Sequence, residues 1–468
     1  MCSSYAQEWE FALDISAGIV FGCIVGVLCA ALVWPMRELP ILWTTTAYPG
    51  DPESVQLLHG KPYWIAVIGG TGALVGVLKL VVALEDDYDG LFKQINQQYV
   101  NPYNMMKLVL ISVVSVSGGA ALGPSAVLGS VGGAVAQVFS ELRGFDDDRV
   151  RRSCLHGIGA ALGCLFPSPV TPMVLVGELG PGDELQAYYL RYFAEMGTSV
   201  LAAYAVNLVI AGRSYLPFVP IGGELGPYEF ESIHLVWGVI FGLLSGVVGL
   251  LIAIGIGVST QVFRSFKRWL PVKVYTVLAP AVGGLLIGAV SIVVPLGFGS
   301  GNSQLLAVIS HVMAHKVSAS LLVASVAAKI ICVSISVGSG FVGGVVFPLY
   351  FVGACLGLAM HMLLGEVTGE PLLLFLSCFI SAVPASLFPI PITHLVTVMG
   401  MLEIGESNCA PMFAACIVSN IVCNGSGALV SLLKCSKRDD LFDAPAMPAV
   451  TEAEGDDADF MDFPEYRY

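Results

Sequence analysis

Long apolar runs separated by short polar or Gly/Pro-rich breaks fill the chain from about residue 11 to about residue 433. The longest runs lie at 11–34, 62–84, 185–210, 233–263 and 274–294. A membrane-crossing helix needs roughly 20 such residues. Two pairs of half-length helices are predicted around Pro-x-Pro turns, at 154–179 and 371–401. The pattern predicts an all-α, polytopic membrane protein in which several helices are short or broken.

Two of the breaks resemble each other, namely GGAALGPSAV at 118–127 and GSGFVGGVVFP at 338–348. Each follows a lysine within apolar sequence, and eleven residues separate Lys107 from Gly118 and Lys329 from Gly340. One Gly-rich stretch alone would equally indicate close helix packing. Matched breaks in two halves are typical of transporters with a binding site near the bilayer midplane. A helix that begins there offers unpaired N–H groups and a positive dipole end to an anion.

The order of elements on either side of these breaks also repeats. A span, a break, a short amphipathic helix, a lysine-containing span, the Gly motif and a pair of half-helices follow one another in 62–179 and again in 274–401. We therefore expect an inverted repeat of tilted and broken helices. The predicted divisions are an N-terminal segment at 1–14, a first membrane repeat at 15–215, a second at 216–435 and an acidic, disordered tail at 436–468.

Composition excludes a soluble protein. The 468 residues are 56% hydrophobic and 12% charged, whereas soluble domains carry about 25% charged residues. The net charge is −14, but residues 439–468 hold ten acidic residues and one arginine, so the low pI says little about the transported ion. Twelve cysteines form no CxxC pair. We expect no enzymatic activity, no cofactor, no metal site and no nucleic-acid partner. The sequence does not indicate which membrane the protein occupies.

The motifs at these breaks resemble those of the CLC family of voltage-gated chloride channels and proton–chloride exchangers. Residues 338–348 are similar to the family's GSGxxGGxFxP segment, and residues 119–127 to its GGSLGPEGP segment. The helix pair around FPSP at 166–169 resembles the family's pair with an Asn-Ala-Pro elbow. The resemblance covers about residues 15–435. It implies a homodimer in a lipid bilayer, with one anion pore in each subunit walled by helix N-termini from both repeats.

The chain departs from the family where protons are handled. The family's gating glutamate matches Ser125, or Pro124 if the alignment shifts by one residue. The first member of its inward-facing Glu-Glu pair matches Glu178 and the second matches Leu179. The serine of its GSGIPE motif falls near the acidic stretch 85–89, and its central tyrosine matches Leu429 or Val430. A proton path through a membrane needs titratable groups, so these departures argue against coupled exchange.

We expect the anion to be held by backbone amides at the two helix starts, with Ser125 at the gating position. The candidate residues are Gly123, Pro124, Ser125, Ala126, Val127, Gly344, Val345, Val346, Phe347 and Leu429. Ser125 could instead be a helix N-cap. Lys107 and Lys329 could add positive field to the anion path, although we expect them to extend to the membrane surface. Glu178 is expected to be a structural hydrogen-bonding group.

The resulting hypothesis is a passive channel for chloride or a similar small anion. The first alternative is a coupled anion/proton exchanger that uses other acids, such as Glu178 or Glu403. The second is a transport-inactive CLC-like scaffold or assembly subunit, which the acidic stretch 85–89 and the lost tyrosine would favour.

Overall fold

The computed structural model describes residues 2–45, 60–84, 90–179, 193–217, 219, 228–314 and 316–425. The first half consists of helices α1 (Cys2–Thr45), α3 (Tyr63–Val81), α4 (Leu91–Gln97), α5 (Pro102–Ser117), α6 (Ser125–Leu142), α7 (Asp147–Gly163), α8 (Val170–Leu179) and α10 (Phe193–Ala211). The second half consists of α11 (Ile233–Phe266), α12 (Val272–Val293), α13 (Asn302–Met313), α14 (Ala319–Ser339), α15 (Val346–Thr368), α16 (Leu372–Leu387), α17 (Pro391–Leu402) and α18 (Ala410–Asn420). The predicted all-α class is confirmed.

Eight of the helices in the described part are long and apolar enough to cross a membrane. They include α1, α3, α10, α11 and α12, whose mean hydropathy over an 18-residue window is 1.5 to 2.7. Helices α5, α8, α16, α17 and α18 are apolar but shorter, at 10–17 residues. A helix of that length cannot cross about 30 Å of hydrocarbon by itself. The described chain therefore combines full spans with half-length helices, as the hydrophobic pattern predicts.

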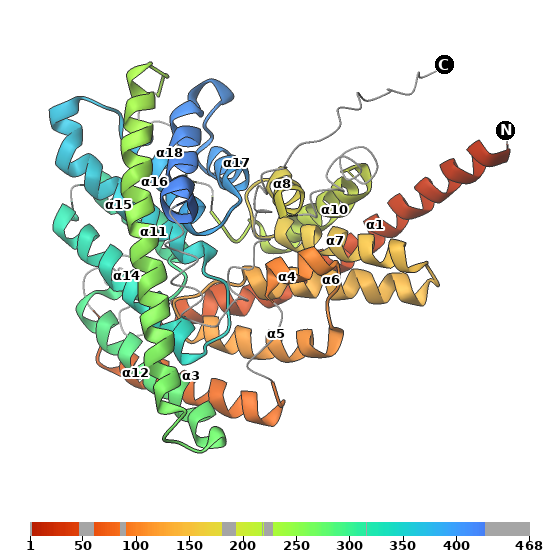
Figure 1. Cartoon of the computed structure of the whole chain (residues 1–468), viewed down its shortest axis with the longest axis horizontal. Helices are drawn as coiled ribbons and strands as arrows, with labels where there is room; N and C mark the ends of the chain where they lie inside the picture. The colour runs from red at the N-terminus through yellow and green to blue at the C-terminus, as the bar shows by residue number, and fades with distance from the viewer. Residues whose placement is uncertain are drawn as a thin grey trace, which may run out of the picture.

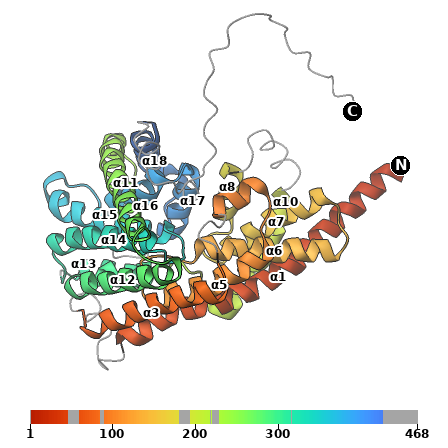
Figure 2. The ribbon, with the colours of Figure 1, turned by 60° about the horizontal axis from the view of Figure 1, so that its bottom comes forward.

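The two halves are joined along helices α3 and α12, which lie side by side in both views (Figures 1 and 2). Glycines allow this approach, because a Cβ on Gly76 would lie only 2.6 Å from the carbonyl oxygen of Thr276. In the same way, a Cβ on Gly288 would lie 2.6 Å from the Cα of Ile65. Small residues at helix contacts are the usual means of close packing in membranes.

The first helix is longer than the sequence predicts. The apolar run that predicts the first span ends at residue 34, but Pro35 and Pro40 lie inside α1, which continues to Thr45. The Thr44 hydroxyl donates to the Pro40 carbonyl oxygen at 2.7 Å. A proline at position 40 removes only the hydrogen bond from its own nitrogen to the carbonyl four residues earlier, and membrane helices tolerate such a loss. The prolines therefore mark no helix end here.

The predicted helix starts also shift towards the N-terminus. Helix α6 begins at Ser125, two residues before the predicted Val127. Helix α7 begins at Asp147 instead of Cys154, with Asp147 and Asp148 in its first turn. Acidic residues are favourable at the positive end of the helix dipole, so this charged segment extends the helix instead of forming a loop.

The order of long and short helices repeats as expected, with α3 to α8 followed by α12 to α17. The exact repeat boundaries at 15–215 and 216–435 stay a prediction. The N-terminal segment belongs to α1, and the acidic tail at 436–468 lies outside the described residues.

Candidate functional site

The two Gly-rich breaks meet in the structure. Gly123 N donates to Gly344 O at 2.7 Å, and Gly344 N donates to Gly123 O at 2.7 Å. This antiparallel pair is an isolated β-bridge between two segments far apart in the sequence. Helix α6 begins two residues after Gly123, and α15 begins two residues after Gly344. The bridge therefore places the N-terminal ends of both helices at one point.

A backbone amide in each break donates a hydrogen bond to a serine of the opposite half. The Ala121 amide donates to the Ser336 hydroxyl oxygen at 3.0 Å, and the Val342 amide donates to the Ser115 hydroxyl oxygen at 3.3 Å. Ser115 and Ser336 lie 221 positions apart (336 − 115 = 221), as do Ala121 and Val342. Each break is thus held by a serine from the helix that leads into the other break. This exchange is what an internal two-fold relation between the halves requires.

The turns that end α5 and α14 share one backbone conformation. Gly119 has φ +97° and Gly340 has φ +92°, which is the left-handed region that favours glycine. These two glycines are again 221 positions apart in the sequence. The matched turns therefore end α5 and α14, and a short non-helical segment follows each of them before α6 and α15 begin.

The first backbone amides of α6 and α15 lie before the point where the regular hydrogen bonds of each helix begin. The first bonds that return to the N-caps run from Leu128 N to Pro124 O at 3.0 Å and from Leu349 N to Val345 O at 3.3 Å. The first amides of an α-helix have no partner within the helix. Those amides belong to residues 125–127 in α6 and 346–347 in α15. Together with two helix dipoles, they make the paired starts a place suited to an anion.

Ser125 lies between the two helix starts and is 4% exposed. A Cβ on Gly344 would meet the Ser125 hydroxyl oxygen well inside van der Waals distance. The Phe347 ring packs against Gly123, because a Cβ on Gly123 would lie only 2.6 Å from that ring. Glycine at both positions is therefore favoured by the close approach of these side chains.

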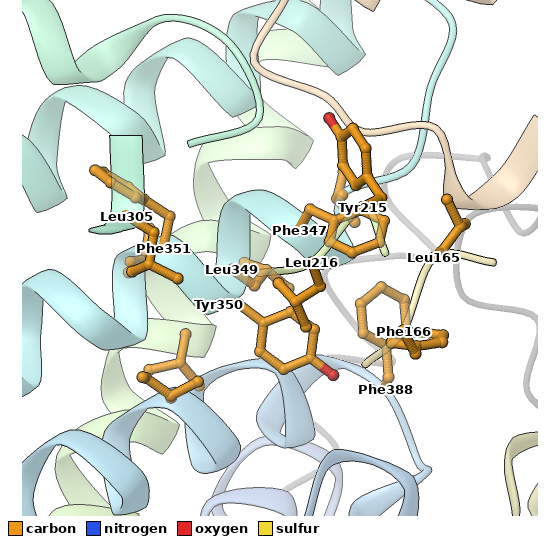
Figure 3. Packing of buried hydrophobic residues seen from close by; sticks show 14 of the residues in the cluster. Leu165, Phe166, Tyr215, Leu216, Leu305, Phe347, Leu349, Tyr350, Phe351 and Phe388 are labelled. Carbon is orange, nitrogen blue, oxygen red and sulfur yellow. The ribbon is translucent and has the colours of Figure 1, made fainter. Parts of the chain in front are cut away.

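Aromatic rings fix the position of Phe347 (Figure 3). Its ring centroid lies 5.0 Å from that of Tyr215 and 6.0 Å from that of Phe166. Tyr215 comes from the segment after α10, and Phe166 from the turn between α7 and α8. Residues 123–127 and 344–347 are thus brought together by the fold, with Ala126 and Val346 half-exposed and Pro124, Ser125, Val127, Val345 and Phe347 buried.

The two lysines have different surroundings. Lys107 is partly exposed and donates to Ala83 O at 3.2 Å, just after α3. Lys329 is fully buried and donates to Phe298 O at 2.7 Å and Gly299 O at 3.0 Å. Its ammonium group also lies 4.6 Å from the centroid of the Phe351 ring. The expectation that Lys329 extends to the membrane surface is wrong, because carbonyl oxygens and an aromatic face satisfy its charge in the interior.

Glu178 caps helix α17 instead of lining the paired starts. Its carboxylate accepts hydrogen bonds from Ile392 N at 2.9 Å, Thr393 N at 2.7 Å and the Thr393 hydroxyl at 2.5 Å. A carboxylate at a helix N-terminus is stabilised by the orphan amides and the dipole. The structural role predicted for Glu178 agrees with these contacts. Leu429 and the acidic stretch 85–89 lie outside the described residues.

Sequence reasoning missed a buried polar pair on α15 and α17. The Tyr350 hydroxyl lies 2.8 Å from His394 Nδ1, and both residues are at most 1% exposed. Nothing in the spacing of residues 350 and 394 indicates this contact, because it depends on how α17 packs against α15. Ser115 and Ser336 were missed for the same reason.

The chain is similar to known transport proteins. Residues 88–424 match the family described as "Voltage gated chloride channel". The chain is 22% identical over 360 residues to the putative ion-transport protein YfeO of Salmonella schwarzengrund, covering 76% of this chain and 82% of that protein. YfeO of Escherichia fergusonii is 23% identical over 362 residues, covering 76% and 81%.

Solved structures share the fold. A slow cyanobacterial Cl⁻/H⁺ antiporter superposes with a TM-score of 0.73 at 20% identity, covering 91% of this chain and 99% of the other. A CLC-type fluoride/proton antiporter superposes with a TM-score of 0.66 at 14% identity, covering 89% and 96%. The family match spans well over half of the chain. This chain is therefore a multi-pass integral membrane protein that belongs to the voltage gated chloride channel (CLC) family of anion transporters.

Proposed function

We propose that the protein conducts chloride or a similar small anion passively, without moving protons. The observation that carries this proposal is the pairing of the α6 and α15 starts across the Gly123–Gly344 bridge, with Ser125 between them. A serine hydroxyl can donate to an anion, but it takes up no proton near neutral pH. The site therefore offers anion ligands without a carboxylate.

The distribution of acids supports the absence of coupling. Residues 90–140 and 232–365 contain no aspartate or glutamate. These ranges include α4, α5 and α11 to α14, all but the last two residues of α6, and α15 up to Gly365. A proton relay through a membrane needs titratable groups along its path. The helices in these two ranges therefore carry no carboxylic acid that could fill this role.

In this proposal the anion is held by the backbone amides of residues 125–127 and 346–347. Gly123 and Gly344 hold the two starts together, while Pro124 and Val345 are the N-caps that lead into the helices. Ser125 occupies the gating position and offers a hydroxyl where the family's gating glutamate stands. Leu429 stays a predicted contact.

Reconstituted liposomes test the proposal. In a chloride gradient, we expect protein-dependent chloride efflux with no movement of protons against their gradient. Ser125→Ala removes one hydrogen bond of about 1 kcal/mol to the anion, so flux should fall about fivefold. Ser140→Ala is the matched control, because Ser140 is buried at the far end of the same helix and should leave flux unchanged. Uphill proton movement driven by chloride would overturn passive conduction.

One observation favours coupled exchange as a second candidate. The Tyr350–His394 pair lies one turn into α15, and imidazole and phenol groups can both pass protons. The solved structures that share the fold include two described as antiporters. In the same liposomes, Tyr350→Phe would abolish proton movement if this candidate were right. If conduction is passive, the Tyr350→Phe protein would carry chloride at the same rate as before, still without moving protons.

Two further expectations belong to this proposal. The family resemblance implies a homodimer, which light scattering of the purified protein in detergent tests. Transport instead of enzymatic activity is expected from family membership. A stable partner recovered with the protein, together with no anion flux under any gradient, would favour a scaffold role instead.

A further inference from the structure

A small cavity lies where the C-terminal part of α1 meets the start of α13. Its polar lining consists of Arg37, Tyr215, Ser300, Asn302, Ser303 and Gln304. Apolar side chains of α1, α5 and the segment before α13 complete the wall. The cavity is separate from the paired starts of α6 and α15 and contains none of their residues.

Several buried polar atoms in this cavity have no hydrogen-bond partner in the structure. Gln304 is 3% exposed, and neither its Nε2 nor its Oε1 is bonded. The Nη1 atom of Arg37 and the Oδ1 atom of Asn302 are likewise buried without a partner. Leaving such a group unsatisfied costs about 1–3 kcal/mol. Because these atoms belong to residues that line one cavity, the cavity is suited to a polar ligand.

Charge decides which ligand fits. Arg37 is cationic and lines the cavity; its Nε is bonded to Glu38 Oε1 at 2.7 Å, while its buried Nη1 has no partner. Helix α13 begins at Asn302 and is 12 residues long, so its positive end faces the same space. The Gln304 amide adds a neutral donor. These donors suit a small anion, and the two acceptor oxygens suit a water molecule that the anion retains.

Tyr215 separates this cavity from the paired helix starts. Its hydroxyl lies 2.9 Å from the Ser300 hydroxyl on the cavity side, while its ring packs on Phe347 at the start of α15 (Figure 3). Gly299 N also donates to Gly119 O at 3.1 Å, which joins the segment before α13 to the break after α5. Lys329 holds the same segment through the carbonyl oxygens of Phe298 and Gly299. The cavity therefore adjoins the proposed anion path.

We propose that this cavity binds one small, partly hydrated monovalent anion, with Gln304 Nε2 and Arg37 Nη1 as donors. Binding there is independent of the proposed function. The cavity would also serve as a waiting site, from which the anion passes Tyr215 to reach the paired starts. Only this second role rests on the proposed function.

Bromide diffraction locates the anions site by site. Crystals of the full chain are soaked in increasing bromide, and anomalous peaks are measured at the cavity and at the paired starts. We expect a cavity peak within hydrogen-bond reach of Gln304 and Arg37. Gln304→Met keeps the length of the side chain but removes the hydrogen bond to the anion, so bromide at this peak should bind about tenfold more weakly. Gln261→Met, at an exposed position on α11, is the matched control and should change neither peak.

Each outcome separates the two proposals. A peak at the paired starts with none at the cavity overturns this inference and leaves the proposed function intact. A cavity peak without one at the paired starts supports this inference and counts against the proposed function. A cavity peak that Gln304→Met leaves unchanged overturns the assignment of its ligands. If Gln304→Met does not fold, Arg37→Met carries the same expectation at the same peak.

Discussion

The contact between Ser125 and Gly344 gives a direct test of how the two helix starts meet. In Gly344→Ala, the new Cβ overlaps only the Ser125 hydroxyl oxygen severely. It lies 3.5 Å from Ser125 Cβ, which is ordinary contact, and 3.2 Å from Ala126 N, which is slightly tight. Overpacking of this kind costs about 1–3 kcal/mol. Most of that loss of stability should come from overlap with one atom, the hydroxyl oxygen of Ser125.

A double-mutant cycle isolates the oxygen. Gly344→Ala alone should lower the melting temperature of the purified protein in detergent by a few degrees. In the Ser125→Ala background the same change should cost much less, because the overlapping atom is gone, and the coupling should be about 1–2 kcal/mol. Gly70→Ala is the control, since a Cβ there has nothing within 4 Å and should not destabilise the protein.

The cycle has one outcome that refutes the geometry. If Gly344→Ala is equally destabilising with serine or alanine at position 125, the hydroxyl does not face Gly344. The bridge between Gly123 and Gly344 would then not hold the α6 and α15 starts in the arrangement on which the anion site depends. Chloride flux measured on the same four proteins would show whether the site tolerates the crowding.

Two further predictions concern buried polar contacts outside the paired starts. Lys329→Met leaves the carbonyl oxygens of Phe298 and Gly299 without their donor, so stability should fall by about 2–3 kcal/mol; an unchanged melting temperature would contradict the contacts. Glu178→Gln weakens the cap of α17, because the amide nitrogen cannot accept from Thr393, and should cost about 1–3 kcal/mol with passive chloride flux retained. A mutant of normal stability that loses proton movement would instead make Glu178 part of a proton relay.

The sequence by itself determined the class of protein and the position of its breaks. Hydrophobic runs of membrane length cannot be hidden in a soluble core, and glycines with a proline cannot continue a helix undisturbed. These local properties located the interruptions near 118–127 and 338–348 and the half-helix pairs. They failed at Pro35 and Pro40, because a membrane helix tolerates the single hydrogen bond that each proline removes and continues.

Only the tertiary structure decided which groups meet. Gly123 pairs with Gly344, Ser115 reaches Val342 and Tyr350 reaches His394 across more than 40 residues in each case, and no local pattern encodes such contacts. The two lysines that precede the breaks also differ in burial. Lys107 is partly exposed, whereas Lys329 is fully buried against carbonyl oxygens. The physical reason is that backbone breaks are a property of single residues, whereas burial and pairing depend on every helix packed around them.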